Sequence, residues 1–280
     1  MSSLPSRSHP SRAYLWPGVL MFGLRSLVNR SHAHCPATLL ISLDGPFSLR
    51  IEDGPKRMEE AVLIAPNVRR ETSAPNTRLV DVLIDPHTKL FERLAGSLSD
   101  PKVVSLEPSV LAPILPSCAE LFDGELNVER ANRLLEDLVS AIEQPPGSRL
   151  DSRVLAAISA IWRLLPDNRI TAEGIAAQVG LSGSRLLHLF SEQTGSTFRQ
   201  YVLWLRIRLA MNLWAENQAI ADIAVGAGFC DQSHFTKTLR RMTDFAPSTL
   251  ANSGQYQCVD CTRTQGIASG SFGAATPEMN

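Results

Sequence analysis

Two sets of side chains alternate at helical spacing along the segment GFCDQSHFTKTLRRM, residues 228–242. Phe229, Phe235 and Leu239 fall on one side of such a helix and predict a buried face. The opposite side carries polar and basic groups: Gln232, Ser233, His234, Lys237, Arg240 and Arg241. Glutamine can hydrogen-bond the edge of adenine and lysine or arginine that of guanine, whereas arginine also binds phosphate. The segment alone fits either a nucleic-acid-binding face or an ordinary solvated helix surface.

The residues just before this segment predict the element that would position it. Ile220, Ile223 and Ala224 lie at helical spacing and predict a short helix. Gly226 and Gly228 follow, and glycine supplies the positive φ that a tight turn between helices often needs. A short helix, a turn and a second helix form a helix-turn-helix unit.

The same arrangement is predicted earlier in the chain. A short helix from Thr171 to Val179 is followed by a turn at Gly180 and a second helix from Ser184 to about Gln193. Three apolar side chains of the second helix point inward in this scheme: Leu186, Leu189 and Phe190. The outward and capping positions are Ser182, Ser184, Arg185, Leu187 and His188. Two units in succession are a much more specific signal than one.

A single helix is predicted to join the two units, over residues 197–214. Eighteen residues span about 27 Å at the rise of an α-helix, and successive major-groove faces of B-DNA are about 34 Å apart. A rigid connection of that length suits two recognition helices in adjacent grooves. Arg206 and Arg208 on this helix are equally suited to ion pairs inside it.

Residues 151–251 resemble the DNA-binding domain of the AraC/XylS family of bacterial transcription regulators. The features that carry the resemblance occur in order: IAAQVGLSGSRLLHLFSEQTG, then Tyr201, Arg206 and Ala210, then IADIAVGAGFCDQSHFTKTLRRM and Pro247. Two positions depart from the family pattern, with Asp244 where glycine is commoner and Leu250-Ala251 in place of a Tyr-Arg ending.

The resemblance implies a sequence-specific regulator that binds double-stranded DNA, with RNA polymerase as a candidate partner. Gln232, Ser233, His234 and Lys237 would then face base edges, and Leu187 would make only apolar contact, for instance with a thymine methyl. The remaining basic residues of the two units, such as Arg240 and Arg241, would meet phosphates.

Between about residues 14 and 84, the sequence pattern of the N-terminal half predicts a β domain. Short apolar or alternating runs (TLLISL, FSLRI, AVLIA and RLVDVLI) are separated by turn signals, and helical spacing begins after Asp85-Pro86. This half resembles the small cupin-like β-barrel found N-terminal to many domains of the same family. The predicted fold class is α+β: a cupin-like barrel with trailing helices, then an all-α domain of two helix-turn-helix units.

His32 and His34 form an HxH pair, a pattern that binds a metal in cupins through neutral imidazoles. The later ligand position falls at Arg69 or Arg70, and no carboxylate ligand is evident, so no metal and no cofactor are predicted. The alternative is that the two histidines line a strand edge or pocket mouth. The four residues are the candidates for an effector site, where an inward arginine would pair with an anionic small molecule.

The segment VERANRLLEDLVSAIE carries an apolar stripe of Leu134, Leu135, Leu138 and Ile142. Such a stripe can form a homodimer contact, as the family resemblance suggests, or bury the helix against its own domain. The sequence leaves both alternatives open.

Composition and local texture give the domain boundaries. The chain is 44% hydrophobic and 20% charged, with a net charge of −1: residues 1–150 carry −2, residues 151–251 carry +2 and residues 252–280 carry −1. We expect a flexible N-terminus (1–13), a cupin-like domain (14–142), a linker (143–150), the helical domain and a disordered tail (252–280).

The five cysteines are scattered and do not form a disulfide framework, which favours a reducing cytoplasm. Cys258 and Cys261 form a lone CxxC in the predicted tail, with no second ligand pair to make a zinc site. The apolar run AYLWPGVLMFGL is split by Pro17-Gly18 and is too short to span a bilayer, so no membrane association is expected.

Three classes of function remain. The first is the DNA-binding regulator, and the second is a cupin-type metalloprotein or enzyme with a helical accessory domain. The third is an adaptor that binds protein through its helical pairs. No nucleophile-base arrangement, P-loop or dinucleotide fingerprint indicates any other enzyme, so no catalytic residue is assigned.

Overall fold

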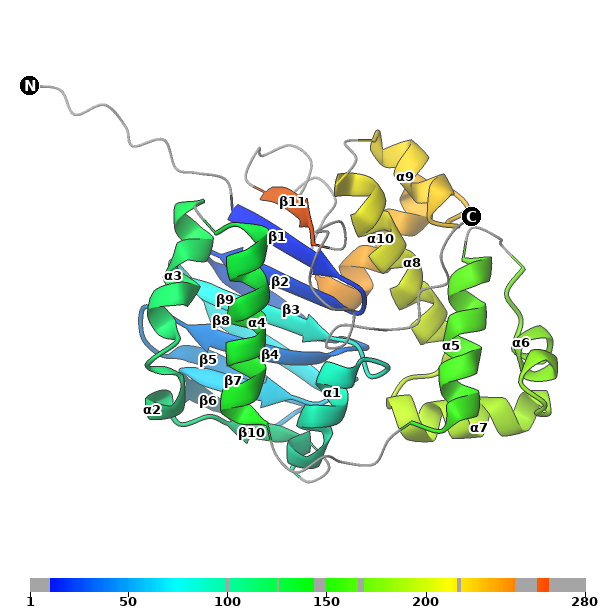
Figure 1. Cartoon of the computed structure of the whole chain (residues 1–280), viewed down its shortest axis with the longest axis horizontal. Helices are drawn as coiled ribbons and strands as arrows, with labels where there is room; N and C mark the ends of the chain where they lie inside the picture. The colour runs from blue at the N-terminus through cyan, green and yellow to red at the C-terminus, as the bar shows by residue number, and fades with distance from the viewer. Residues whose placement is uncertain are drawn as a thin grey trace, which may run out of the picture.

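The protein folds into a β-rich N-terminal domain and a helical C-terminal domain, which lie side by side (Figure 1). The computed structural model describes residues 11–98, 101–124, 126–143, 150–165, 169–215, 218–244 and 256–261. The predicted linker lies mostly outside the described residues. Among the described helices, none combines the length and hydropathy needed to cross a bilayer.

The strands of the first domain form two sheets instead of one closed barrel. The larger sheet has the order β10-β7-β4-β9-β2-β1-β11 and the smaller one β3-β8-β5-β6. The cupin-like interpretation is corrected in this respect. The strands are β1 (Ser11–Trp16), β2 (Val19–Leu24), β3 (Leu27–Ala33), β4 (Ala37–Ser42), β5 (Phe47–Ile51), β6 (Lys56–Glu59), β7 (Ala61–Ile64), β8 (Arg69–Ala74), β9 (Leu79–Ile84), β10 (Val103–Ser105) and β11 (Tyr256–Asp260).

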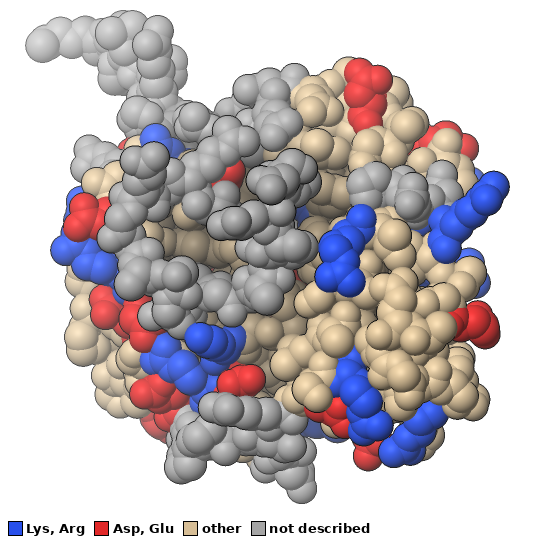
Figure 2. Space-filling model, turned by 45° about the vertical axis from the view of Figure 1, so that its right-hand side comes forward, with Lys and Arg blue, Asp and Glu red and all other residues tan. Residues whose placement is uncertain are grey.

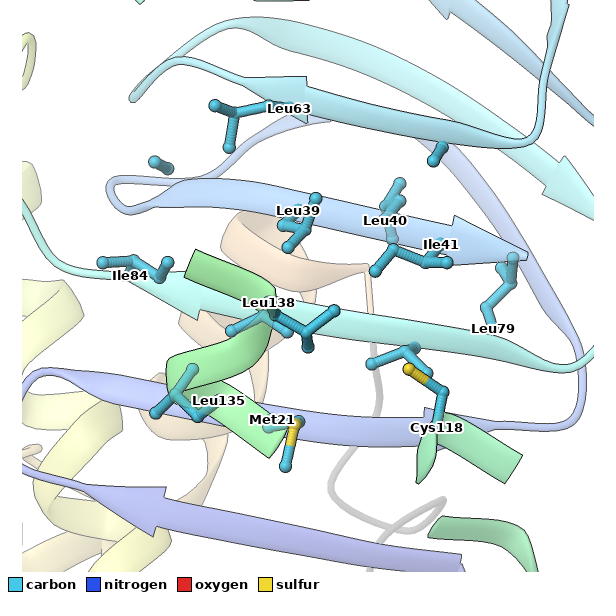
Figure 3. Packing of buried hydrophobic residues seen from close by; sticks show 14 of the residues in the cluster. Met21, Leu39, Leu40, Ile41, Leu63, Leu79, Ile84, Cys118, Leu135 and Leu138 are labelled. Carbon is cyan, nitrogen blue, oxygen red and sulfur yellow. The ribbon is translucent and has the colours of Figure 1, made fainter. Parts of the chain in front are cut away.

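The middle strands of the larger sheet are buried on both faces, which explains their nearly continuous apolar sequences. On β9, Val82 and Ile84 face the helices of the first domain, whereas Leu83 joins the core of the helical domain. Figure 3 shows the first of these two faces, where Met21 and Ile84 of the sheet lie close to Leu135 and Leu138 of α4.

The helices that follow the sheets cover this face. They are α1 (Lys89–Leu94), a short 3-10 helix (Ala95–Leu98), α2 (Pro108–Leu111), α3 (Leu115–Asp123) and α4 (Val128–Ile142). All four residues of the apolar stripe on α4 are buried in the core of the same domain. The stripe therefore serves to bury α4 against its own sheet, and it is not available as a dimer contact.

Two boundary predictions are wrong. The N-terminal segment 1–13 was expected to be flexible, but Ser11 already begins β1 and Ala13 pairs with Phe22 of β2. The predicted disordered tail contains β11, which pairs in parallel with β1 at the edge of the larger sheet. The error at β11 arises because this edge strand is fixed by a distant partner, β1, and not by local sequence.

The helical domain consists of six helices: α5 (Ser152–Leu164), α6 (Ala172–Gln178), α7 (Gly183–Thr194), α8 (Phe198–Ala215), α9 (Ile220–Gly226) and α10 (Gln232–Thr243). Its apolar core also includes Leu15, Leu20, Cys35 and Leu83 of the first domain. The two domains therefore share a buried apolar interface.

Candidate nucleic-acid interface

The first helix-turn-helix unit consists of α6 and α7, and a side-chain hydroxyl caps the start of each helix. The hydroxyl of Thr171 accepts a hydrogen bond from the backbone of Gly174, and that of Ser182 accepts one from Arg185. These bonds satisfy backbone N–H groups that the first turn of a helix leaves free. Gly180 has φ +69° between the two helices, as a tight turn requires.

The second unit consists of α9 and α10. Asp231 caps α10 by accepting a hydrogen bond from the backbone of His234 at 2.7 Å. Gly228 has φ +81°, and a Cβ atom there would lie 2.4 Å from the carbonyl oxygen of Leu165, so only glycine fits. Phe229 and Phe235 are buried with their ring centroids 5.2 Å apart and join the turn to α10.

The structure places most of the predicted DNA-contacting side chains on the solvent side of the two second helices. Those exposed are Ser182, Ser184, Arg185, Leu187 and His188 in the first unit and Gln232, Ser233, Lys237, Arg240 and Arg241 in the second. His234 is half-buried, with its ring at the edge of Phe229 and its Nδ1 accepting from the backbone of Cys230. His234 is thus engaged in holding the turn.

Lys and Arg side chains on the face seen in Figure 2 are separated by other residues and do not form one continuous basic patch. This agrees with the modest charge of +2 over residues 151–251. Nucleic-acid affinity based on phosphate contacts alone would therefore be limited, and hydrogen bonds to bases would have to supply much of the free energy of specific binding.

Arg208 of α8 connects the two domains through a buried polar network. It is 2% exposed, and its Nη2 donates to the carbonyl oxygen of Trp16 at 2.6 Å. Its Nη1 lies 4.0 Å from Oδ2 of Asp85, whose Oδ1 accepts from the indole of Trp204 at 2.6 Å. Burial lowers the pKa of Arg208, whereas Asp85 raises it. The sequence suggested ion pairs within this helix, but the acid is at the end of β9.

Of the four candidate effector residues, three are buried together and Arg69 is exposed. The Nε2 atoms of His32 and His34 lie 2.9 Å apart, and Arg70 donates from Nη2 to Nδ1 of His34 and to Thr38. Burial, and secondly Arg70, lower the pKa of His32 to about 4 and that of His34 well below its ordinary value. Both rings are therefore neutral at pH 7.

A pocket opens between the two domains next to this cluster. The space between its walls is about 560 Å³ when the adjoining open solvent is included. The residues that line it come from β2, β9, α8, α10 and the segment after β3: Leu20, Phe22, Leu24, His34, Asp81, Leu83, Trp204, Ile207, Met211, Leu239 and Thr243. A sequence signal for Asp81 exists: it is the one charged residue within the apolar run LVDVLI, residues 79–84.

The comparisons with known proteins agree with the geometry of the helical domain. A family model described as a helix-turn-helix domain matches residues 175–253. The arabinose operon regulatory protein of Escherichia coli (strain K12) is 31% identical over 131 residues, and the transcriptional activator RhaS of Klebsiella pneumoniae (strain 342) is 36% identical over 79 residues. Residues 175–253 form an AraC-type helix-turn-helix domain.

The alignment with the arabinose regulator covers 45% of this chain and 45% of that protein, so less than half the length of this AraC/XylS relative is matched. The alignment with RhaS covers 28% of each chain.

Similarity of the whole fold comes from solved structures. ToxT from Vibrio cholerae O395 superposes with a TM-score of 0.56 at 15% identity, covering 83% of this chain and 95% of that one. A structure of ToxT from strain SCE256 with a bound unsaturated fatty acid has the same TM-score at 16% identity. The two-domain fold of this chain is thus shared with ToxT.

Proposed function

We propose that the protein is a sequence-specific DNA-binding transcription regulator whose N-terminal domain binds a small-molecule effector. The observation that carries the proposal is that α7 and α10 both expose polar faces while one uninterrupted 18-residue helix, α8, joins their units. A helix of this length spans about 27 Å, which suits recognition helices in successive major grooves.

Within this proposal, Gln232, Ser233 and Lys237 of α10 and the exposed residues of α7 face base edges. Arg240 and Arg241 lie in the last turn of α10 and contact phosphates, which fixes the position of the helix on the duplex. His234 positions the N-terminus of α10 and contributes less to base reading.

The effector site is proposed at the pocket between the domains, beside His32, His34 and Arg70, and not inside a closed barrel. A pocket lined by both domains suits regulation, since a ligand there would contact α8 and α10 directly. The similar ToxT binds an unsaturated fatty acid in one of its solved structures, which supports an effector of small size. A cytoplasmic location, a homodimer and contact with RNA polymerase belong to the same proposal.

The metalloprotein alternative is less well supported. The facing nitrogens of the HxH pair contact each other, and a guanidinium occupies the other side of His34. Within the described residues no group of three or more His, Cys, Asp or Glu side chains is placed to hold a metal ion. A cation next to Arg70 would also be repelled.

Selection of bound sequences from random duplex DNA tests the main proposal. The full chain is the right material, because the helical domain shares its core with residues of the first domain. We expect an enriched motif with two half-sites about one helical turn apart. Retention of DNA without any enriched sequence would reject specific recognition.

Replacement of Lys237 or Gln232 by alanine is expected to weaken binding to the selected site by about 1–3 kcal/mol and to relax base preference at one half-site. The reason is that each side chain is exposed on α10 and can pair with a base edge. Titrations against the selected site and against single-base variants measure both effects.

Arg240→Ala is the matched control on the same helix. Loss of a phosphate contact should weaken binding to all sequences alike and reduce the salt dependence. Uniform weakening by Lys237→Ala and Gln232→Ala as well would show that they do not read bases.

A further inference from the structure

The lining of the pocket between the domains indicates the chemistry of what binds there. Eight of the eleven lining residues are apolar, and the polar ones are His34, Asp81 and Thr243. None of the eleven is lysine or arginine. A bound anion would therefore have no lining cation to pair with.

Asp81 is the unusual member of this lining. It lies in the middle of β9, is 4% exposed, and its Oδ1 has no hydrogen-bond partner. Burial raises the pKa of Asp81 to about 6, although Arg70 opposes the rise. A buried carboxylate oxygen without a donor is costly, and native proteins rarely retain one without a function.

We infer that the pocket binds an uncharged, largely apolar molecule that donates a hydrogen bond to Asp81. A hydroxyl group on an apolar body has this chemistry, because the body contacts the aliphatic and aromatic lining while the hydroxyl satisfies Oδ1. A carboxylic acid is disfavoured, since its anion would lie against Asp81, and Arg70, the cation that interacts with Asp81, does not line the pocket. This inference deepens the proposed function by naming the class of effector.

Three probes of similar shape separate the classes: 4-butylphenol, butylbenzene and 4-butylbenzoate. Isothermal titration of the full chain at pH 7 should show the phenol binding about tenfold more tightly than the hydrocarbon, the effect of one hydrogen bond to a charged group. The benzoate should bind more weakly than both. In Asp81→Leu, the phenol and the hydrocarbon should bind equally.

Benzoate binding as tightly as the phenol would overturn the inference, and so would failure of all three probes to bind. The comparison of probes on the unaltered chain remains decisive if Asp81→Leu does not fold. Selection of DNA sequences by the same preparation tests the regulator proposal separately, so failure of one does not imply failure of the other.

A second observation, independent of the lining, concerns how the pocket is connected to α10. Arginine has only donors, so Nδ1 of His34 accepts from Arg70, and His34 must carry its proton on Nε2. That proton is donated to Nε2 of His32, which leaves Nδ1 of His32 to donate to the carbonyl oxygen of Arg30 at 2.7 Å. Every hydrogen bond in this series is therefore donated in the same direction, from Arg70 through the two neutral imidazoles to Arg30.

This series of hydrogen bonds continues from Arg30 to the end of α10. The ladder between β3 and β8 is irregular between Asn29 and His32, and irregularities of this kind redirect backbone groups. The backbone N–H of Arg30 donates to Oδ2 of Asp244 at 2.8 Å, and its guanidinium donates to Oδ1 at 3.2 and 3.3 Å.

Asp244 ends α10 with φ +57°, a conformation that favours glycine. The family resemblance also gives glycine as the commoner residue at this position. The contact with Arg30 accounts for aspartate there, because glycine has no side chain to accept these bonds.

We propose that this series of hydrogen bonds, Arg70–His34–His32–Arg30–Asp244, couples the pocket to α10. His34 lines the pocket. A ligand that shifts its ring therefore disturbs the hydrogen bonds between Arg30 and Asp244 at the end of α10. This coupling rests on the proposed function, since it assigns a regulatory output to α10.

A double-mutant cycle tests the coupling without any ligand or DNA. Hydrogen exchange of the α10 backbone amides is measured for His32→Phe, Asp244→Asn and the double variant. Each single change should accelerate exchange severalfold, and the double variant should exchange no faster than the faster single one. If the two rate increases multiply in the double variant, the proposed coupling is rejected. An unchanged exchange rate in either single variant would reject it as well. Arg69→Ala, exposed on β8, serves as the control and should change nothing.

Discussion

Replacement of Arg208 by methionine is expected to lower the free energy of unfolding by about 3–5 kcal/mol, the usual cost of removing one partner from a buried ion pair. Arg208 and Asp85 are 2% and 0% exposed, so the carboxylate left behind has no access to water. The carbonyl oxygen of Trp16 also loses its donor. Urea denaturation followed by tryptophan fluorescence measures the loss.

Neutralising the remaining acid distinguishes loss of charge compensation from loss of packing. In Arg208→Met combined with Asp85→Asn, the amide oxygen can still accept from Trp204, and no buried charge is left unpaired. We expect the double variant to recover at least half of the stability lost by the single one. A single variant as stable as the unaltered protein would show that the network does not hold the domains together.

Replacement of Phe235 by alanine is expected to cost about 3–5 kcal/mol, as for other buried aromatic residues. Phe235 is buried on α10 and contacts Phe229, which closes the turn of the second unit. Because α10 carries Lys237, the same change should also weaken DNA binding. Thermal melting and a DNA titration on the same sample measure both effects.

Leu187→Ala is the matched control, since Leu187 is an apolar residue of α7 that is 43% exposed. Its stability effect should stay within about 0.5 kcal/mol, as is usual for surface positions. Equal losses for the two variants would mean that Phe235 is not part of the core of the second unit.

The helix-turn-helix units could be predicted from the sequence because their determinants are local. Thr171, Ser182 and Asp231 accept hydrogen bonds from backbone groups within three residues, and Gly180 and Gly228 set positive φ angles in place. Such determinants act within about one helical turn, so they can be recognised from the sequence of neighbouring residues.

The errors concern features fixed by residues far apart in the chain. Strands β1 and β11 pair across more than two hundred residues, and the sequence of neither strand specifies the other as its partner. The same is true of the two sheets, which the turn signals could not distinguish from a closed barrel.

By itself, the sequence determined the two helix-turn-helix units and the face that the second helix of each exposes, since helical periodicity and caps depend on neighbouring residues. Only the tertiary structure decided that Arg208 pairs with Asp85, that Asp244 is held by Arg30, and that Asp81 lines a pocket between the domains. The physical reason is that a buried charge depends on whichever group the fold brings beside it, and that group is specified by packing and not by sequence distance.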